Sequence, residues 1–105
     1  MSFEIRSDKE ISVIYLNGRF VFDCQKDFRK ATDQALERSG TRIIQLDMGK
    51  VEYLDSSALG MLLLLKEKSE NSGRTIQIKH LKGMARQIIE IANFDKVFTI
   101  LAEDV

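Results

Sequence analysis

Apolar and polar residues alternate along the first part of the chain. In residues 3–7 and 11–16 an apolar residue recurs at nearly every second position, and β-branched residues are frequent, as is typical of half-buried strands. The polar link at residues 8–10 predicts that these strands form a hairpin at one side of a sheet. Asn17-Gly18 then predicts a turn, after which residues 19–22 lead, extended, toward a helix.

The spacing of apolar residues changes in the next segment. In residues 24–38, Phe28, Ala31 and Ala35 recur three and four positions apart, and charged residues occupy the positions between them, which predicts an amphipathic helix. Asp23 is the candidate N-cap, and Ser39-Gly40 ends the helix. A nearly continuous apolar strand follows at residues 41–48, and Gly49-Lys50 is expected to end it.

The remaining elements complete an α/β pattern. A polar turn at residues 51–55 leads into a helix that begins at Ser56 or Ser57, followed by an alternating strand at Thr75–Lys79. A last helix at residues 84–92 precedes a short extended tail at 93–101. The order strand, helix, strand predicts parallel pairing through a right-handed crossover.

The orientation of the helix after Ser57 leaves two interpretations open. At roughly 100° per residue, Leu59, Leu62 and Leu63 share one face, which we assign to the sheet. Met61, Leu64 and Leu65 fall on another arc. That second arc is either an exposed patch for a protein partner or part of a wide core stripe.

For Gly60 and for the segment 20–22 the sequence also leaves two interpretations open, contact within the protein or contact with a partner. Glycine inside a helix costs about 1 kcal/mol relative to alanine, so either a neighbouring element or a partner is expected to approach Gly60 closely. In the connection Phe20-Val21-Phe22, either two residues anchor the loop on the core or one stays at the surface for a partner.

Length and charge exclude several function classes. The 105 residues fit one domain, 1–105, and 16 basic and 16 acidic residues are interspersed, so no basic footprint for nucleic acid is expected. One cysteine cannot form an internal disulfide, and the N-terminus has no signal-peptide pattern. The apolar run 61–65 is far shorter than the roughly 20 residues that cross a bilayer. We expect a soluble cytoplasmic monomer without membrane insertion.

Catalytic and metal-binding groups are sparse. The chain has one His and one Cys, His80 and Cys24, on different predicted elements, so no nucleophile–base pair is supported. His80 is interpreted as a surface or turn residue. Asp47 and Asp55 bracket the polar turn and could share a cation, but no cluster has metal-ligand spacing. We expect no enzyme activity, no metal and no cofactor.

The start of the helix carries the most specific chemistry. Asp55, Ser56 and Ser57 are all N-cap residue types, and a hydroxyl there is usually a cap. The same position lies at the positive end of a helix, where a phosphoserine would also fit. A cap and a phosphoacceptor do not exclude each other.

The sequence Asp55-Ser56-Ser57-Ala58-Leu59-Gly60, after a hydrophobic strand and a short turn, resembles the signature of the STAS domain of bacterial anti-sigma factor antagonists. The order of predicted elements agrees over nearly the whole chain. The resemblance implies a STAS fold: a small mixed β-sheet with packed α-helices and a single layer of core between them. It also implies that Ser56, the first serine of the pair, is reversibly phosphorylated.

The resemblance also implies a function. Unphosphorylated, the protein would bind an anti-sigma factor that is also a serine kinase, or a comparable regulator, and a cognate serine phosphatase would remove the phosphate. The expected partner-binding residues come from the signature, the helix and the preceding connection: Asp55, Ser57, Gly60, Met61, Leu64, Phe20, Val21 and Phe22. Val21 stands where the family commonly has an acidic residue. The alternative is a constitutive STAS subunit of an ATP-driven lipid-transport complex.

Overall fold

The computed structural model, which describes residues 1–102, contains one sheet with the strand order β1-β2-β3-β4-β5. Strand β1 is antiparallel to β2, and each later neighbouring pair is parallel. This confirms the predicted hairpin and the parallel pairing of the strands around the central helix. The strands are β1 (Ser2–Asp8), β2 (Ile11–Phe20), β3 (Ile43–Leu54), β4 (Thr75–Lys79) and β5 (Thr99–Ile100).

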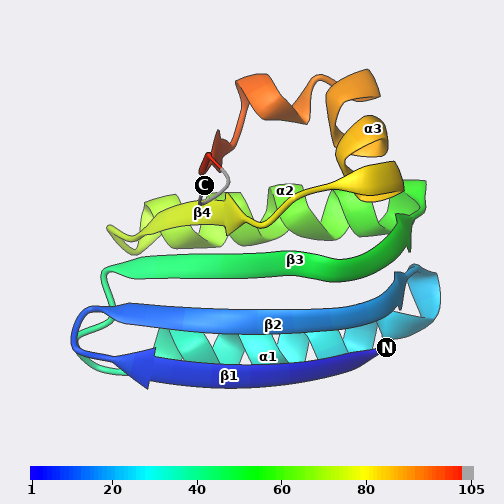
Figure 1. Cartoon of the computed structure of the whole chain (residues 1–105). Helices are drawn as coiled ribbons and strands as arrows, with labels where there is room; N and C mark the ends of the chain where they lie inside the picture. Colours follow the sequence, from blue (N-terminus) through cyan, green and yellow to red (C-terminus); the bar gives the residue numbers. More distant parts are fainter. Residues whose placement is uncertain (103–105) are drawn as a thin grey trace.

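The two longer helices cover one face of the sheet (Figure 1). These are α1 (Gln25–Glu37), which follows the 3₁₀ turn η1 (Phe22–Cys24), and α2 (Ser56–Asn71). Helix α3 (Gly83–Ile91) lies beyond the carboxyl end of β4 and packs on β3 and on a second 3₁₀ turn, η2 (Phe94–Lys96). The predicted extended tail is therefore partly wrong, because η2 precedes the short strand β5.

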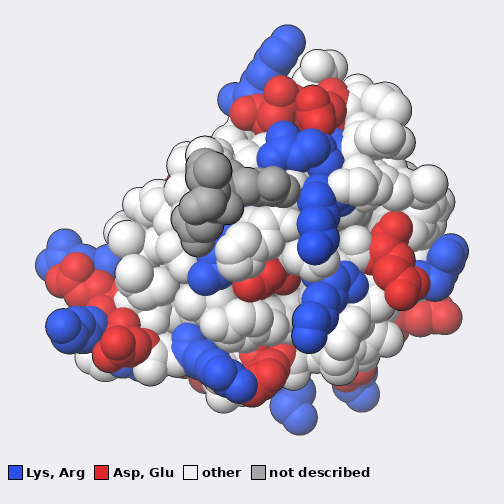
Figure 2. Space-filling view, in the orientation of Figure 1, with Lys and Arg blue, Asp and Glu red and all other residues white. Residues whose placement is uncertain are grey.

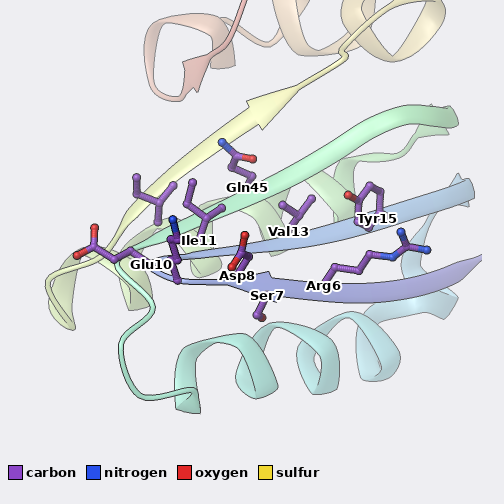
Figure 3. Close-up of a pocket in the computed structure, with 10 residues that line it drawn as sticks. Arg6, Ser7, Asp8, Glu10, Ile11, Val13, Tyr15 and Gln45 are labelled. Carbon is purple, nitrogen blue, oxygen red and sulfur yellow. The ribbon is translucent and has the colours of Figure 1, made fainter.

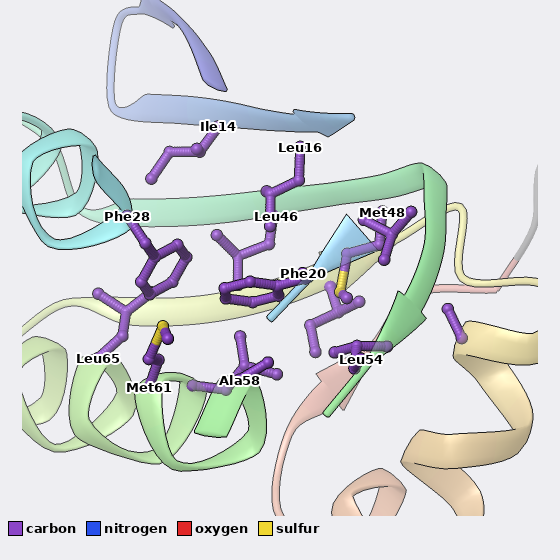
Figure 4. Close-up of a cluster of buried hydrophobic side chains, with 14 of the residues drawn as sticks. Ile14, Leu16, Phe20, Phe28, Leu46, Met48, Leu54, Ala58, Met61 and Leu65 are labelled. Carbon is purple, nitrogen blue, oxygen red and sulfur yellow. The ribbon is translucent and has the colours of Figure 1, made fainter. Parts of the chain in front are cut away.

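The core is a single layer between the sheet and the helices, as predicted (Figure 4). Alternate residues of the central strands point into it because successive side chains of a strand face opposite sides. Those residues are Ile14, Leu16, Ile44, Leu46, Met48, Ile76 and Ile78. Helices α1 and α2 close the layer with Phe28, Ala35, Ala58, Leu62 and Leu65.

Two predicted strand ends are wrong for one reason. Asn17-Gly18 does not turn the chain, and Gly49-Lys50 does not end the second strand, because β2 and β3 continue side by side to Phe20 and Leu54. The pairing accommodates the glycine with register shifts on both sides of Gly18, whose φ is 115°. The parallel ladder between distant segments outweighs the local turn preference.

The start of α1 also differs from the prediction. Cys24 is the N-cap residue and makes no side-chain capping bond, while Asp23 lies inside η1. The predicted helix bounds are otherwise close, since α1 begins at Gln25 and ends at Glu37. Asp23 is therefore not a cap of this helix.

Candidate functional site

Asp55 caps helix α2. Its backbone is extended, and its Oδ1 accepts a hydrogen bond from the backbone N–H of Ala58 at 2.9 Å. The side chain thus satisfies one of the donors that the first turn of a helix leaves without a partner. The capping role falls to Asp55 rather than to either serine.

The same carboxylate holds the connection between β2 and α1. Its Oδ2 accepts a hydrogen bond from the backbone N–H of Phe22 at 3.0 Å, and the backbone N–H of Asp55 donates to the carbonyl oxygen of Phe20 at 3.2 Å. Phe22 and Asp55 are 33 positions apart in sequence. Asp55 therefore positions the segment 20–22 beside the first turn of α2.

Ser56 is left exposed at this junction. It is the first residue of α2 and lies at the surface, whereas Ser57 is half-buried. Within residues 1–102 the Ser56 hydroxyl makes no hydrogen bond with another side chain or with the backbone. Because Asp55 already caps the helix, modification of Ser56 would not remove the cap.

The buried face of α2 agrees with the predicted one only in part, because Leu62 is buried and Leu59 packs against the core as predicted, but other residues are buried as well. The inward residues are Ala58, Met61, Leu62, Leu65 and Ser69. Met61 is buried and therefore does not form part of an exposed surface, and Leu65 is also in the core. Leu63, which the pattern assigned to the sheet, is exposed.

The exposed side of α2 carries an apolar stripe. Ser56, Gly60, Leu63 and Leu64 lie on the face opposite the core, because positions three and four apart fall on one side of a helix. Leu64, 49 % exposed, confirms one predicted surface residue. Leu63 was missed because a run of five apolar residues contains no polar position that marks the solvent side.

The connection before α1 divides its three apolar residues between core and surface. Phe20 is fully buried, with its ring centroid 4.8 Å from that of Phe28, so its prediction as a partner contact is wrong. Val21 is half-buried against the core, and Phe22 is 61 % exposed. We call Phe22, Ser56, Gly60, Leu63 and Leu64 the partner face.

A small hollow adjoins the partner face. Its volume is about 80 Å³, and it lies between α1 and α2 with Met61 and Phe28 among its lining residues. Leu64 borders both the hollow and the exposed stripe. The buried Met61 thus contributes to the shape of this surface from below, although it is not itself exposed.

Gly60 gives the partner face a flat centre. A Cβ atom built on Gly60 would have no neighbouring atom within 4 Å, apart from the backbone of its own helix. No element of residues 1–102 therefore packs closely enough to require glycine there. The explanation that a neighbouring element of the protein requires glycine at this position is therefore wrong.

Replacing Gly60 with Ala is expected to stabilise the protein by about 0.5–1 kcal/mol, because alanine restricts the unfolded chain and the added methyl group meets open space. Urea denaturation of the two proteins measures the difference. A matched Gly73→Ala variant, in which φ is 75°, should instead be destabilised. Lower stability of Gly60→Ala would show that the site is not open.

Asp47 and His80 form a separate pair. Nδ1 of His80 lies 3.0 Å from Oδ2 of Asp47, whose Oδ1 accepts the backbone N–H of Gly49. His80 lies in the turn after β4, as predicted, with φ of 60°. Since Asp47 and Asp55 have different partners, they do not form the shared cation site considered from the sequence, and residues 1–102 contain no cluster of three metal-binding side chains.

Charged side chains of both signs are interspersed over the open face of the sheet (Figure 2). The view shows the side opposite α1 and α2. This distribution differs from the clustered basic surface of a nucleic-acid-binding protein. Among the described helices, none combines the length and apolar character needed to span a membrane.

Comparison with known proteins gives consistent matches over nearly the whole chain. A family model described as "Mlab, STAS domain" matches residues 3–102. A STAS-domain containing protein of Pseudomonas aeruginosa (strain UCBPP-PA14) is 34% identical over 94 residues, which cover 90% of this chain and 91% of the relative.

Solved structures share the fold at lower identity. An anti-sigma factor antagonist from Mycobacterium paratuberculosis has a TM-score of 0.82 at 19% identity, covering 94% of this chain and 83% of its own. The Bacillus cell fate determinant SpoIIAA in its phosphorylated form has a TM-score of 0.71 at 16% identity, covering 97% of this chain and 93% of its own.

Proposed function

Because this chain belongs to the STAS domain family, with a fold like that of anti-sigma factor antagonists, we propose that it is a protein-binding regulator switched by phosphorylation of Ser56. In its unphosphorylated form it binds an anti-sigma factor with serine kinase activity, or a comparable regulator. A cognate serine phosphatase restores the binding form. The protein itself acts by binding and carries out no catalysis.

The observation that carries this proposal is the free hydroxyl of Ser56 within an exposed apolar surface. Ser56 and Gly60 are one helical turn apart, and Leu63 and Leu64 follow on the same side of α2. Exposed apolar surface next to polar groups is typical of a protein interface. A kinase can reach the hydroxyl without unfolding the helix, since Asp55 provides the cap.

Phosphorylation would change the partner face without changing the fold. It adds about −1.5 to −2 charges, which the N-terminus of a helix tolerates well. A partner that covers Leu63 and Leu64 would have to desolvate this charge or lose part of the contact. A loss of only about 1.4 kcal/mol lowers affinity tenfold.

The names of two structural relatives support the same type of function. One is an anti-sigma factor antagonist, and the other is a cell fate determinant whose phosphorylated form has been solved. In this chain Ser56 occupies the first serine of the Asp-Ser-Ser signature. We propose that Asp55 and Ser57 border the contact, Asp55 chiefly by positioning Phe22.

A pull-down from native cell extract tests the proposal. Wild type, Ser56→Ala and Ser56→Asp serve as baits, and mass spectrometry identifies the bound proteins. We expect Ser56→Ala to retain a regulator that Ser56→Asp binds at least about tenfold more weakly, since tenfold corresponds to about 1.4 kcal/mol. Ser39→Asp, exposed after α1, is the control for added charge.

Three further outcomes are informative. If all three baits capture one transport ATPase equally, the protein is a constitutive subunit of a transport complex and the switch is rejected. If Gly60→Ala retains its stability but loses the regulator, the flat centre of the partner face takes part in binding. If Gly60→Ala and Ser56→Asp both bind as wild type does, the partner uses another surface.

A further inference from the structure

Strand β1 forms a regular edge of the sheet. Its pairing with β2 runs without a register shift from Ser2↔Asn17 to Asp8↔Ile11, and its other side has no strand neighbour in the described chain. Proteins commonly protect such edges with charged side chains, proline, a bulge or a very short strand, and β1 has only the first of these, at Glu4, Arg6 and Asp8. Strand β1 is seven residues long, and it contains neither a proline nor a bulge.

Two of the three charged residues of β1, Glu4 and Arg6, flank Ile5 symmetrically. Glu4 and Arg6 point to the open face of the sheet and form an exposed ion pair, with Nη2 and Oε1 2.9 Å apart and side chains 61 % and 70 % exposed. Their hydrogen bond, and then the negative charge of Glu4, raise the pKa of Arg6. If two β1 strands pair antiparallel with Ile5 opposite Ile5, each Glu4 faces Arg6 of the second copy.

The helix side of the same edge combines apolar and polar side chains. A groove of about 360 Å³ lies between β1 and α1 and is lined by Phe3, Ile5 and Ala31 together with the polar residues Asp27, Lys30 and Gln34. Phe3 and Ile5 are only partly buried, at the margin of the core. An added antiparallel strand would place its own Ile5 and Phe3 on this side, because alternate residues share a face.

From these observations we propose that β1 is a homodimer edge, at which two copies pair antiparallel about Ile5 and join their sheets into one. The contact is isologous, so each favourable pair occurs twice. It differs from the predicted monomer, because the sequence pattern alone did not show that this strand edge is free and regular. The partner face remains accessible, since α2 packs on β3 and β4 rather than on β1.

The open face of the sheet would continue across the junction. Figure 3 shows Arg6, Val13 and Tyr15 on this face, where Arg6 also lies over the ring of Tyr15 with its Cζ 5.6 Å from the centroid. Tyr15 belongs to β2, so this contact keeps the Arg6 side chain on the open face of the sheet, the face to which Glu4 of a second copy would also point. Glu4 and Arg6 already pair within one copy. To form the proposed contact, each side chain has only to exchange this neighbour for the oppositely charged residue of the second copy.

Charge-swap variants test the register of the proposed dimer. Sedimentation velocity is measured over a concentration series for wild type, Glu4→Arg, Arg6→Glu and the double variant Glu4→Arg/Arg6→Glu. Each single variant places like charges opposite each other twice and should raise the dimer dissociation constant about tenfold or more. The double variant restores opposite charges and should dimerise as wild type does.

An equimolar mixture of the two single variants is the sharpest measurement. Glu4→Arg then presents two positive charges to the two negative charges of Arg6→Glu, so heterodimers should form although neither variant self-associates. Thermal melting of each variant checks that the monomer fold is intact, as expected for exposed side chains. A wild type that stays monomeric up to about millimolar concentration overturns the proposal, because that dissociation constant corresponds to only about 4 kcal/mol. The proposal is also overturned if the protein dimerises but neither Glu4→Arg nor Arg6→Glu changes the dimer dissociation constant.

Discussion

Replacing Phe20 with Ala is expected to lower the free energy of unfolding by about 3–5 kcal/mol, whereas Phe22→Ala should change it by no more than about 0.5 kcal/mol. The two residues are two positions apart, but only Phe20 is fully buried. Its ring packs on Phe28, so truncation removes apolar contact and leaves a cavity in the single core layer.

The matched pair separates folding from binding in the connection between β2 and α1. Equilibrium urea denaturation gives the stability of both variants, and the pull-down gives their binding. Phe22→Ala keeps the backbone N–H that donates to Asp55, so it should remain folded while binding the regulator more weakly. Equal stabilities of the two variants would contradict the core position of Phe20.

Replacing Asp55 with Ala should destabilise the protein by about 2 kcal/mol. About 1 kcal/mol comes from loss of the helix cap, and a similar amount from loss of the charged acceptor for the backbone N–H of Phe22. Asp55→Asn keeps one carbonyl oxygen for the cap and should lose only about half as much. Urea denaturation curves with unchanged slopes would report both differences.

The binding readout shows whether the carboxylate also positions the partner face. If it does, Asp55→Asn should bind the regulator more weakly than its modest loss of stability explains, because Phe22 is no longer held beside α2. An Asp55→Ala variant as stable as wild type would contradict the double role. The two hydrogen bonds that Asp55 accepts would then contribute little to the free energy of unfolding.

The partner face could be only partly predicted from sequence. The sequence pattern places Ser56, Gly60, Leu64 and Phe22 at the surface, where the structure has them, but it wrongly includes the buried Phe20 and Met61 and misses Leu63. Residues 61–65 are all apolar, so helical periodicity cannot tell which side of α2 meets the sheet. Packing of α1 against α2 buries Met61 and leaves Leu63 and Leu64 outside.

The sequence by itself determined the elements whose signal is local. Alternation predicted the strands, three- and four-residue spacing predicted α1, and the cap residues before the apolar run placed Ser56 at the start of α2. These signals depend on side chains within one or two turns of each other. Their order predicted the hairpin and the parallel crossover, and the resemblance to the STAS domain implied the mixed sheet with its single core layer.

Tertiary structure decided what depends on residues far apart in the chain. Pairing between β2 and β3 extended both strands beyond Gly18 and Gly49, and the bonds of Asp55 to the segment 20–22 set which aromatic residue faces solvent. Each of these outcomes depends on contacts between segments about 30 positions apart. Local pattern cannot encode them, because the partner of each group is fixed only when the sheet and helices pack together.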